Sequence, residues 1–168
     1  SDLLESLAST PAERQRLLEG YFEPTEEERE EGKKLPSPAH HAIAKMMAQG
    51  RVRVVITTNF DRLLERALNE QGVSPAVIST PDDAGGAPPL SQAQHLIIKV
   101  HGDYLDARIK NSPDELRAYD EAIDLLLDRV LDEFGLVVCG WSADWDEALR
   151  TAFSRCPNRR YSLFWAAR

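Results

Sequence analysis

The segment Val52–Asp61, with the sequence VRVVITTNFD, contains the change of pattern that decides the fold. Its first half is a run of β-branched residues, which is typical of a short strand buried in a parallel sheet. The polar residues Thr57, Thr58, Asn59 and Asp61 follow directly. Because ligands bind beyond the carboxyl ends of the strands in open α/β sheets, the segment predicts both a strand and a candidate binding loop.

Apolar runs alternate with helical patterns through the rest of the chain. Further strands are expected at residues 76–78, 95–100, 136–139 and 161–165, helices at residues 61–71 and 144–153, and one or two helices within residues 113–134. The stretch 81–91 contains two glycines and three prolines, so we expect it to be a loop. This alternation predicts an α/β fold with a parallel sheet.

The residues before Val52 have a different character, because they are polar and helical in pattern. Thr10 is placed to cap a helix, with proline at the first helical position and glutamate at the third. Residues 39–49 predict a second helix, whose inward-facing residues are expected to be Ile43, Met46 and Met47. We therefore expect a helical segment over residues 1–50 and the α/β core over residues 51–168.

Composition excludes several classes of function. A formal net charge of −8 argues against binding to nucleic acid or to an anionic membrane. No apolar run approaches the roughly 18 residues that span a bilayer. The two cysteines, Cys139 and Cys156, form no Cys-x-x-Cys pair, which argues against a zinc ribbon and indicates a reducing cytoplasm.

Two more polar clusters follow predicted strands. His101-Gly102-Asp103 comes after the strand at 95–100, and Gly140-Trp141-Ser142 comes after the strand at 136–139. Each cluster alone is explained as well by helix capping or a turn, and Trp141 by packing at the sheet edge. Since the carboxyl ends of parallel strands meet at one edge, the clusters together predict a ligand site there.

These clusters resemble the motifs of one family. Thr57–Asp61 resembles the T-x-N-x-D segment of sirtuin-like domains, Val100–Asp103 resembles their histidine-glycine segment, and Gly140–Ser142 their later Gly-x-Ser/Thr segment. The resemblance covers about residues 50–165, and it is closer to the bacterial NAD-consuming branch than to the protein deacetylases. It implies a Rossmann-like, NAD-binding domain and a role in defence against phage.

The resemblance also implies roles for the matching residues. Asn59 would position a water beside the nicotinamide ribose, and His101 would be the general base. The implied NAD-binding residues are Thr57, Thr58, Asn59, Asp61, Gly102, Gly140, Trp141 and Ser142, with no metal ligand among them. Such a set suits cleavage of the nicotinamide–ribose bond, since an oxocarbenium-like state needs orientation and charge compensation more than a strong nucleophile.

The sequence departs from the family pattern in two places. No Gly-x-Gly element precedes Val52, so we expect the glycine-rich phosphate loop to lie upstream of Ser1 and this chain alone to have weak or no activity. The four-cysteine zinc module of the deacetylases is missing, and residues 102–139 leave no room for it. Binding of an acetylated peptide is therefore not expected.

Several functions remain open at this point. NAD glycohydrolysis or ADP-ribosyl transfer in the full-length protein is the leading hypothesis. A sensor that binds NAD or ADP-ribose without cleaving it is the alternative, and a protein deacylase is less favoured. A metal-dependent hydrolase is disfavoured because the histidines show no ligand spacing. The sequence sets neither an oligomeric state nor further domains.

Overall fold

The computed structural model of the chain describes residues 10–106, 117–156, 158 and 160–166. One sheet contains β1 (Val54–Thr57), β3 (Leu96–Lys99) and β2 (Ala76–Ile78) in that order, and a second sheet pairs β4 (Leu136–Cys139) with β5 (Leu163–Ala166). All pairs are parallel, which confirms the predicted α/β fold. Strands β1 and β4 each have an edge with which no described strand pairs, so the described strands form two separate sheets.

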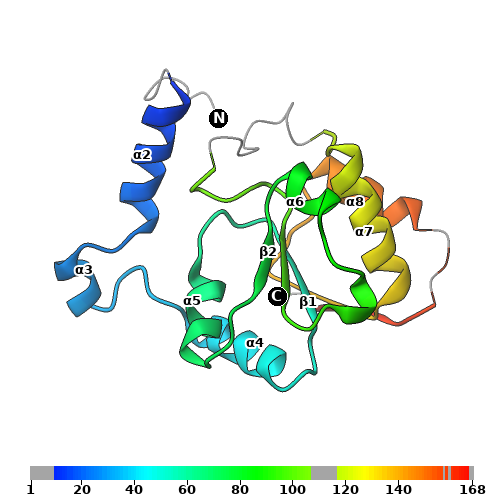
Figure 1. Ribbon diagram of the computed structural model, residues 1–168, viewed down its shortest axis with the longest axis horizontal. Helices are drawn as coiled ribbons and strands as arrows, with labels where there is room; N and C mark the ends of the chain where they lie inside the picture. Colours follow the sequence, from blue (N-terminus) through cyan, green and yellow to red (C-terminus); the bar gives the residue numbers. More distant parts are fainter. Residues whose placement is uncertain (1–9, 107–116, 157, 159, 167–168) are drawn as a thin grey trace.

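Strand β3 is the centre of the larger sheet, and all four of its residues are buried. Ile97 faces a cluster formed with α4 (Pro38–Ala48) and α5 (Leu63–Glu70). Its neighbours in sequence face the opposite cluster, formed with α7 (Glu121–Glu133) and α8 (Glu147–Arg155). Figure 1 shows the two helix pairs on opposite sides of the sheet. This alternation explains why the strand has no polar residue before Lys99.

The β4–β5 sheet is far less covered. Val137 is 69% exposed and Phe164 is 64% exposed, and no residue of β5 is buried. Parallel sheets are ordinarily covered on both faces, because their strands are apolar on both. Within the described residues, the second sheet therefore leaves apolar side chains in contact with solvent.

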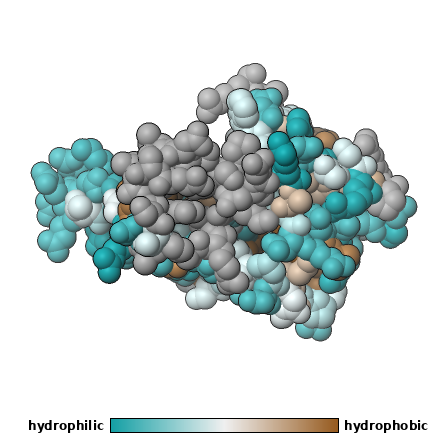
Figure 2. Space-filling model, turned by 90° about the horizontal axis from the view of Figure 1, so that it is seen from above, coloured by the Kyte–Doolittle hydropathy of each residue, from teal (hydrophilic) through white to brown (hydrophobic). Residues whose placement is uncertain are grey.

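The N-terminal helices begin as the capping pattern predicts. Helix α2 (Pro11–Phe22) starts with a capping box, in which Thr10 Oγ1 accepts from the Glu13 backbone N–H at 3.2 Å. The end of α2 packs on the loops after β1 and β3, where Leu18 and Phe22 contact Tyr104 and Phe60. The glutamate-rich helix α3 (Glu26–Glu30) forms a hydrophilic end of the molecule (Figure 2).

The expected division of the chain at residue 50 stays a prediction. Helix α4 lies before this boundary, yet it packs directly on α5 and the large sheet. Ala44 and Met47 are buried on its inner face, whereas Met46 is 40% exposed, so the inward placement of Met46 was wrong. At 3.6 residues per turn, Met46 lies well to the side of the stripe that contains Ala44 and Met47.

The prediction of a loop over residues 81–91 was also wrong. This stretch contains a short helix α6 (Pro81–Gly85) and a 3₁₀ turn η1 (Leu90–Gln92). The reason is local, since Thr80 and Asp83 form a capping box around Pro81, which favours a first helical turn.

Two predicted helices begin later than expected. Helix α5 begins at Leu63, and helix α8 begins at Glu147 because the Asp146 side chain caps it. Within the stretch 113–134, where one or two helices are expected, residues 113–116 lie outside the described residues and α7 occupies Glu121–Glu133. Among the helices described, none combines the length and the apolar character needed to cross a bilayer.

Candidate functional site

The loops that follow β1 and β3 lie side by side at one edge of the large sheet. The Val100 N–H donates to the Thr57 carbonyl at 3.1 Å, and the Tyr104 N–H donates to the Phe60 carbonyl at 3.2 Å. These bonds continue the pairing of the two strands into their loops. They bring the segment that contains Asn59 next to the segment that begins at His101.

Within the first loop, the polar side chains differ in their hydrogen bonds and in their exposure to solvent. Thr57 Oγ1 accepts from the Asn59 N–H at 3.1 Å, and Asp61 Oδ1 accepts from the Leu63 N–H at 3.0 Å. Thr57 and Asp61 thus shape the turn that leads into α5, and α5 itself has no side-chain cap. Thr58 is half-buried, and the Asn59 side chain is exposed to solvent. Asn59 is therefore the residue of this loop that is most accessible to a ligand.

A buried lysine, Lys99, lies beneath these loops. Its side chain is only 1% exposed, and its Nζ lies 2.7 Å from Glu65 Oε1 and 2.8 Å from Asp103 Oδ2. It also donates to the Asp61 carbonyl at 2.5 Å. The Glu65 contact is an ion pair without hydrogen-bond geometry. Lys99 thereby joins the β1 loop, α5 and the β3 loop through one cation.

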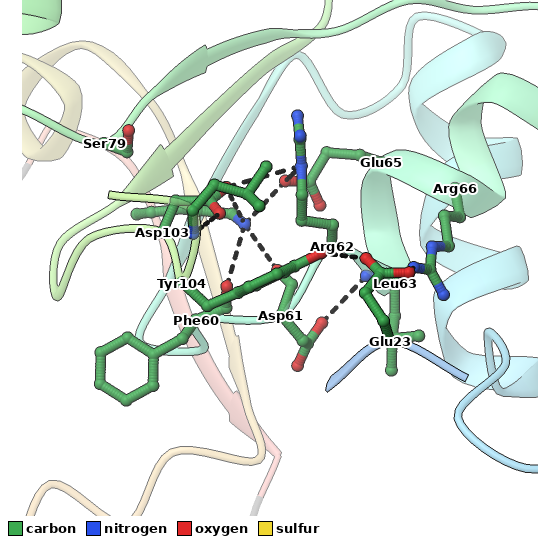
Figure 3. Close-up of polar contacts among 12 residues, drawn as sticks. Glu23, Phe60, Asp61, Arg62, Leu63, Glu65, Arg66, Ser79, Asp103 and Tyr104 are labelled. Carbon is green, nitrogen blue, oxygen red and sulfur yellow. Dashed lines mark hydrogen bonds and ion pairs between the residues drawn. The ribbon is translucent and has the colours of Figure 1, made fainter. Parts of the chain in front are cut away.

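Arg62 completes this group, which we call the Lys99 cluster (Lys99, Glu65, Asp103 and Arg62). The Arg62 guanidinium lies 3.7 Å from Glu65 and 3.6 Å from Asp103, and it is partly exposed (Figure 3). Two cations thus face two carboxylates, so the cluster is electrically balanced. The sequence carries one signal for it, a charged residue that ends the apolar run LIIK, because buried lysines require partners.

A neighbouring bridge ties α2 to the same loops. The Tyr104 hydroxyl donates to one oxygen of Glu23, and Arg66 donates to the other (Figure 3). The bond from Tyr104 is the main reason that the pKa of Glu23 lies below its ordinary value. Burial, followed by the bond to Glu23, raises the pKa of Tyr104 above its ordinary value. This bridge holds the helical segment against the candidate site.

His101 lies in a second buried polar group, the His101 cluster (His101, Asp146 and Tyr119). His101 Nε2 is 2.7 Å from Asp146 Oδ2, and His101 is 8% exposed. The Tyr119 hydroxyl donates to both oxygens of Asp146, at 2.9 and 2.8 Å. The rings of Phe60 and Tyr119 lie near the imidazole, with centroids 6.1 and 6.3 Å away.

Charge in the His101 cluster is governed by Asp146, which is 3% exposed. Burial alone would raise the pKa of Asp146, but hydrogen bonds from His101, the Leu149 N–H and Tyr119 outweigh it, and the pKa lies below its ordinary value. The pKa of Tyr119 is raised by its own burial and then by the Asp146 charge. Asp146 is therefore an ionised acceptor with neutral Tyr119 as donor.

Asp146 and Tyr119 were not predicted from the sequence. Asp146 lies 45 residues from His101, and Tyr119 lies 27 residues from Asp146. Asp146 falls inside the helix predicted over residues 144–153, where nothing in the sequence singles it out. Its contact with His101 depends on tertiary packing, because α8 and Val100, next to His101, belong to one core cluster.

The third predicted cluster follows β4 and is mostly exposed. Gly140 has a φ of +73°, a left-handed conformation that favours glycine. A Cβ added at this position would have no neighbouring atom within 4 Å among the described residues. Ser142 is exposed as well. The Trp141 ring stacks between Phe153 and Trp165, at centroid distances of 5.4 and 5.5 Å. Trp141 therefore packs at the sheet edge, and its backbone is the part left for a ligand.

Gly102, the remaining predicted residue, forms the turn between the two buried clusters. Its φ is +93°, and its N–H donates to the Lys99 carbonyl at 3.1 Å. A side chain at this position would strain the turn. Gly102 is buried, and its turn directs His101 and Asp103 to different clusters.

A pocket of about 460 Å³ opens beside the Lys99 cluster, at the end of β2. Its lining includes Arg62 and Asp103 with Asp82, Asp83 and Asp106, and neither Asn59 nor His101 belongs to it. Four carboxylates and one guanidinium make this pocket unfavourable for an anionic pyrophosphate. We therefore place the candidate site at the His101 side of the edge.

A family model described as a SIR2-like domain matches residues 53–163. The chain belongs to the SIR2-like family. The match contains strands β1 to β4 and every predicted site residue, and it ends at the first residue of β5. No curated protein is similar enough to the chain to count as a relative.

SIR2-like domains are NAD-related. No group of three or more histidine, cysteine or carboxylate side chains among the described residues has the geometry to hold a metal ion. The described edge contains a paired histidine, His101, and an exposed amide, Asn59. This combination suits proton transfer and polar orientation of a ligand.

Proposed function

We propose that the protein binds NAD at the edge formed by the loops after β1 and β3, together with the loop after β4 of the second sheet, and cleaves its nicotinamide–ribose bond. The observation that carries the proposal is the juxtaposition of the Asn59 loop and His101 through hydrogen bonds between their backbones. Membership in the SIR2-like family supports NAD as the substrate. The bacterial NAD-consuming branch is the part of the family that we propose for this chain.

The proposed reaction is a hydrolysis. The bond between ribose C1′ and the nicotinamide nitrogen breaks, and nicotinamide leaves with the bonding electrons. A water held by Asn59 forms the new bond to C1′ and gives its proton to His101, which yields ADP-ribose. An acceptor hydroxyl in place of water would make the same chemistry an ADP-ribosyl transfer. The Gly140 and Ser142 backbone, with Thr57, Thr58 and Gly102, would line the remainder of the nucleotide.

The test is nicotinamide release by the intact natural protein. We expect His101→Ala and Asn59→Ala each to lower the rate about a hundred-fold or more, the usual contribution of a general base or an orienting group. The matched controls are His95→Ala, at the opposite end of the β3 region, and Asn69→Ala, on exposed α5 surface. Equal rates in the natural protein and the two site variants would refute the proposal.

One observation favours a binding module without turnover. Asn59 and Ser142 are exposed, whereas cleavage through an oxocarbenium-like state benefits from exclusion of bulk water. Calorimetry with NAD and with ADP-ribose, run beside the nicotinamide assay, separates the two functions. Binding that depends on Asn59, with no nicotinamide released, would establish the sensor.

A further inference from the structure

The His101 imidazole has two nitrogens in different surroundings. Nε2 contacts the Asp146 carboxylate at 2.7 Å. Within the described residues, Nδ1 makes no hydrogen bond. Nδ1 is therefore the nitrogen that is free to exchange a proton with a ligand, because Nε2 is in contact with Asp146.

Asp146 is itself held firmly. Its Oδ1 accepts from the Leu149 N–H at 2.8 Å, which caps α8, and both of its oxygens accept from the Tyr119 hydroxyl. Helix α8 is anchored by Ala148, Leu149 and Ala152, all buried in the main core cluster. A cap and a packed helix thus fix the carboxylate relative to the end of β3.

The donors around Asp146 determine where the proton on His101 lies. The Leu149 N–H can only donate, and an ionised carboxylate can only accept. Because Asp146 is ionised beside His101, Nε2 must carry the hydrogen of this contact. The neutral ring then has a lone pair on Nδ1.

We propose that Asp146 is a positioning residue that holds His101 in its Nε2–H form and so makes Nδ1 the base of the site. This inference rests on the proposed function, because it assigns the proton-accepting atom of that reaction. Nδ1 takes the proton of the attacking water as the C1′–nicotinamide bond breaks. The imidazolium that results lies against the Asp146 carboxylate, which stabilises its charge. Tyr119 in turn holds the carboxylate.

The variant that tests the proposal is Asp146→Asn. Asparagine is as good a helix cap as aspartate, so α8 is expected to keep its start, and a melting temperature measures this directly. The asparagine amide, however, can donate toward Nε2. His101 would then move to the Nδ1–H form, with no lone pair left for the water proton. Glu147→Gln is the matched control, since it removes one negative charge from an exposed position in the same helical turn.

The first readout does not require activity. Long-range ¹H–¹⁵N spectra of histidine-labelled chain, at a pH where the ring is neutral, report which nitrogen carries the hydrogen, and His101→Ala assigns the signal. We expect the Nε2–H form in the natural chain, in Glu147→Gln and in Tyr119→Phe, which keeps the carboxylate. We expect loss of that form in Asp146→Asn. An Nδ1–H form in the natural chain, no change in Asp146→Asn, or loss of the Nε2–H form in Tyr119→Phe would each overturn the proposal.

The second readout is nicotinamide release by the intact natural protein. We expect Asp146→Asn to lower kcat about a hundred-fold or more while KM changes by less than about three-fold, because proton transfer rather than binding is lost. An unchanged kcat beside a changed tautomer would overturn the role of Nδ1 as base. If the natural protein releases no nicotinamide, the proposed function fails, while the tautomer result still decides the positioning role.

Discussion

Two buried polar clusters, the Lys99 cluster and the His101 cluster, lie on either side of Gly102. They contain similar residue types but differ in how their charges are paired. In the Lys99 cluster, each carboxylate faces two cations, and Lys99 also contacts a backbone carbonyl. In the His101 cluster, one imidazole nitrogen has no hydrogen bond within the described residues. A cluster in which every charge is matched holds loops together. A cluster with one unused lone pair retains a place for a ligand proton.

The largest effect is expected from Lys99→Met. This change leaves Glu65 and Asp103 buried without their main counter-charge, which typically costs about 3–5 kcal/mol of stability. Denaturant unfolding of the chain measures the loss. Lys45→Met, at an exposed position on α4, is the control and should change stability by less than about 0.5 kcal/mol. Equal small losses in the two variants would show that the Lys99 cluster is not structural.

A smaller effect is expected from Tyr119→Phe. Its hydroxyl donates to a buried carboxylate, and such bonds contribute about 1.5–3 kcal/mol. Tyr104→Phe is the comparison, because the partner of that hydroxyl, Glu23, is accessible to water that can replace the lost bond. Unfolding curves that show the greater loss for Tyr104→Phe would contradict the assigned burial of the His101 cluster.

A pH dependence should also distinguish Asp146. Its pKa in the folded chain lies below the ordinary value, so its charge stabilises the fold above the unfolded pKa of about 3.9 and this stabilisation is lost as the pH falls through the folded pKa. The stability difference between the natural chain and Asp146→Asn should therefore shrink on acidification below about pH 4. Unfolding at a series of pH values measures it, with exposed Asp144→Asn as the control. A difference that grows toward low pH would reverse the assigned sign.

The smallest effect is expected at Ala143, in the loop that leads to Asp146. Ala143 has a φ of +63°, which strains an alanine by about 1–2 kcal/mol. Ala143→Gly relieves this strain but adds freedom to the unfolded chain, so we expect a gain of a few tenths of a kcal/mol. Ala42→Gly, on the exposed surface of α4, should instead lose about 1 kcal/mol. Thermal unfolding compares the two, and a loss at Ala143 would contradict the backbone conformation.

Much of the fold could be predicted because local sequence patterns, apolar runs and capping residues, determine it. The apolar runs at 76–78 and 136–139 correspond to β2 and β4 to the residue, and Thr10 caps α2 as expected. The start of α8 and the short helix at Pro81 were missed, because side-chain caps rather than apolar periodicity determine them.

The candidate site was only partly predictable, for a different reason. Asn59 and His101 follow strands, so the general rule for α/β sheets indicates them. Asp146 and Lys99 matter through partners that are distant in the sequence, and a single sequence carries no record of those pairs. Residue types at strand ends predict where chemistry is placed, while the tertiary packing decides which atom performs it.

The exposed β4–β5 sheet has a consequence for local opening of the molecule. With no buried residue in β5, this sheet should open to amide hydrogen exchange at a lower free energy than the covered strands around β3. The loop at Gly140 and Ser142 is attached to that easily opened unit. A nucleotide bound there would slow exchange in β4 and β5 before it affected β3, so occupancy of the site would be recorded first in the least protected amides of the chain.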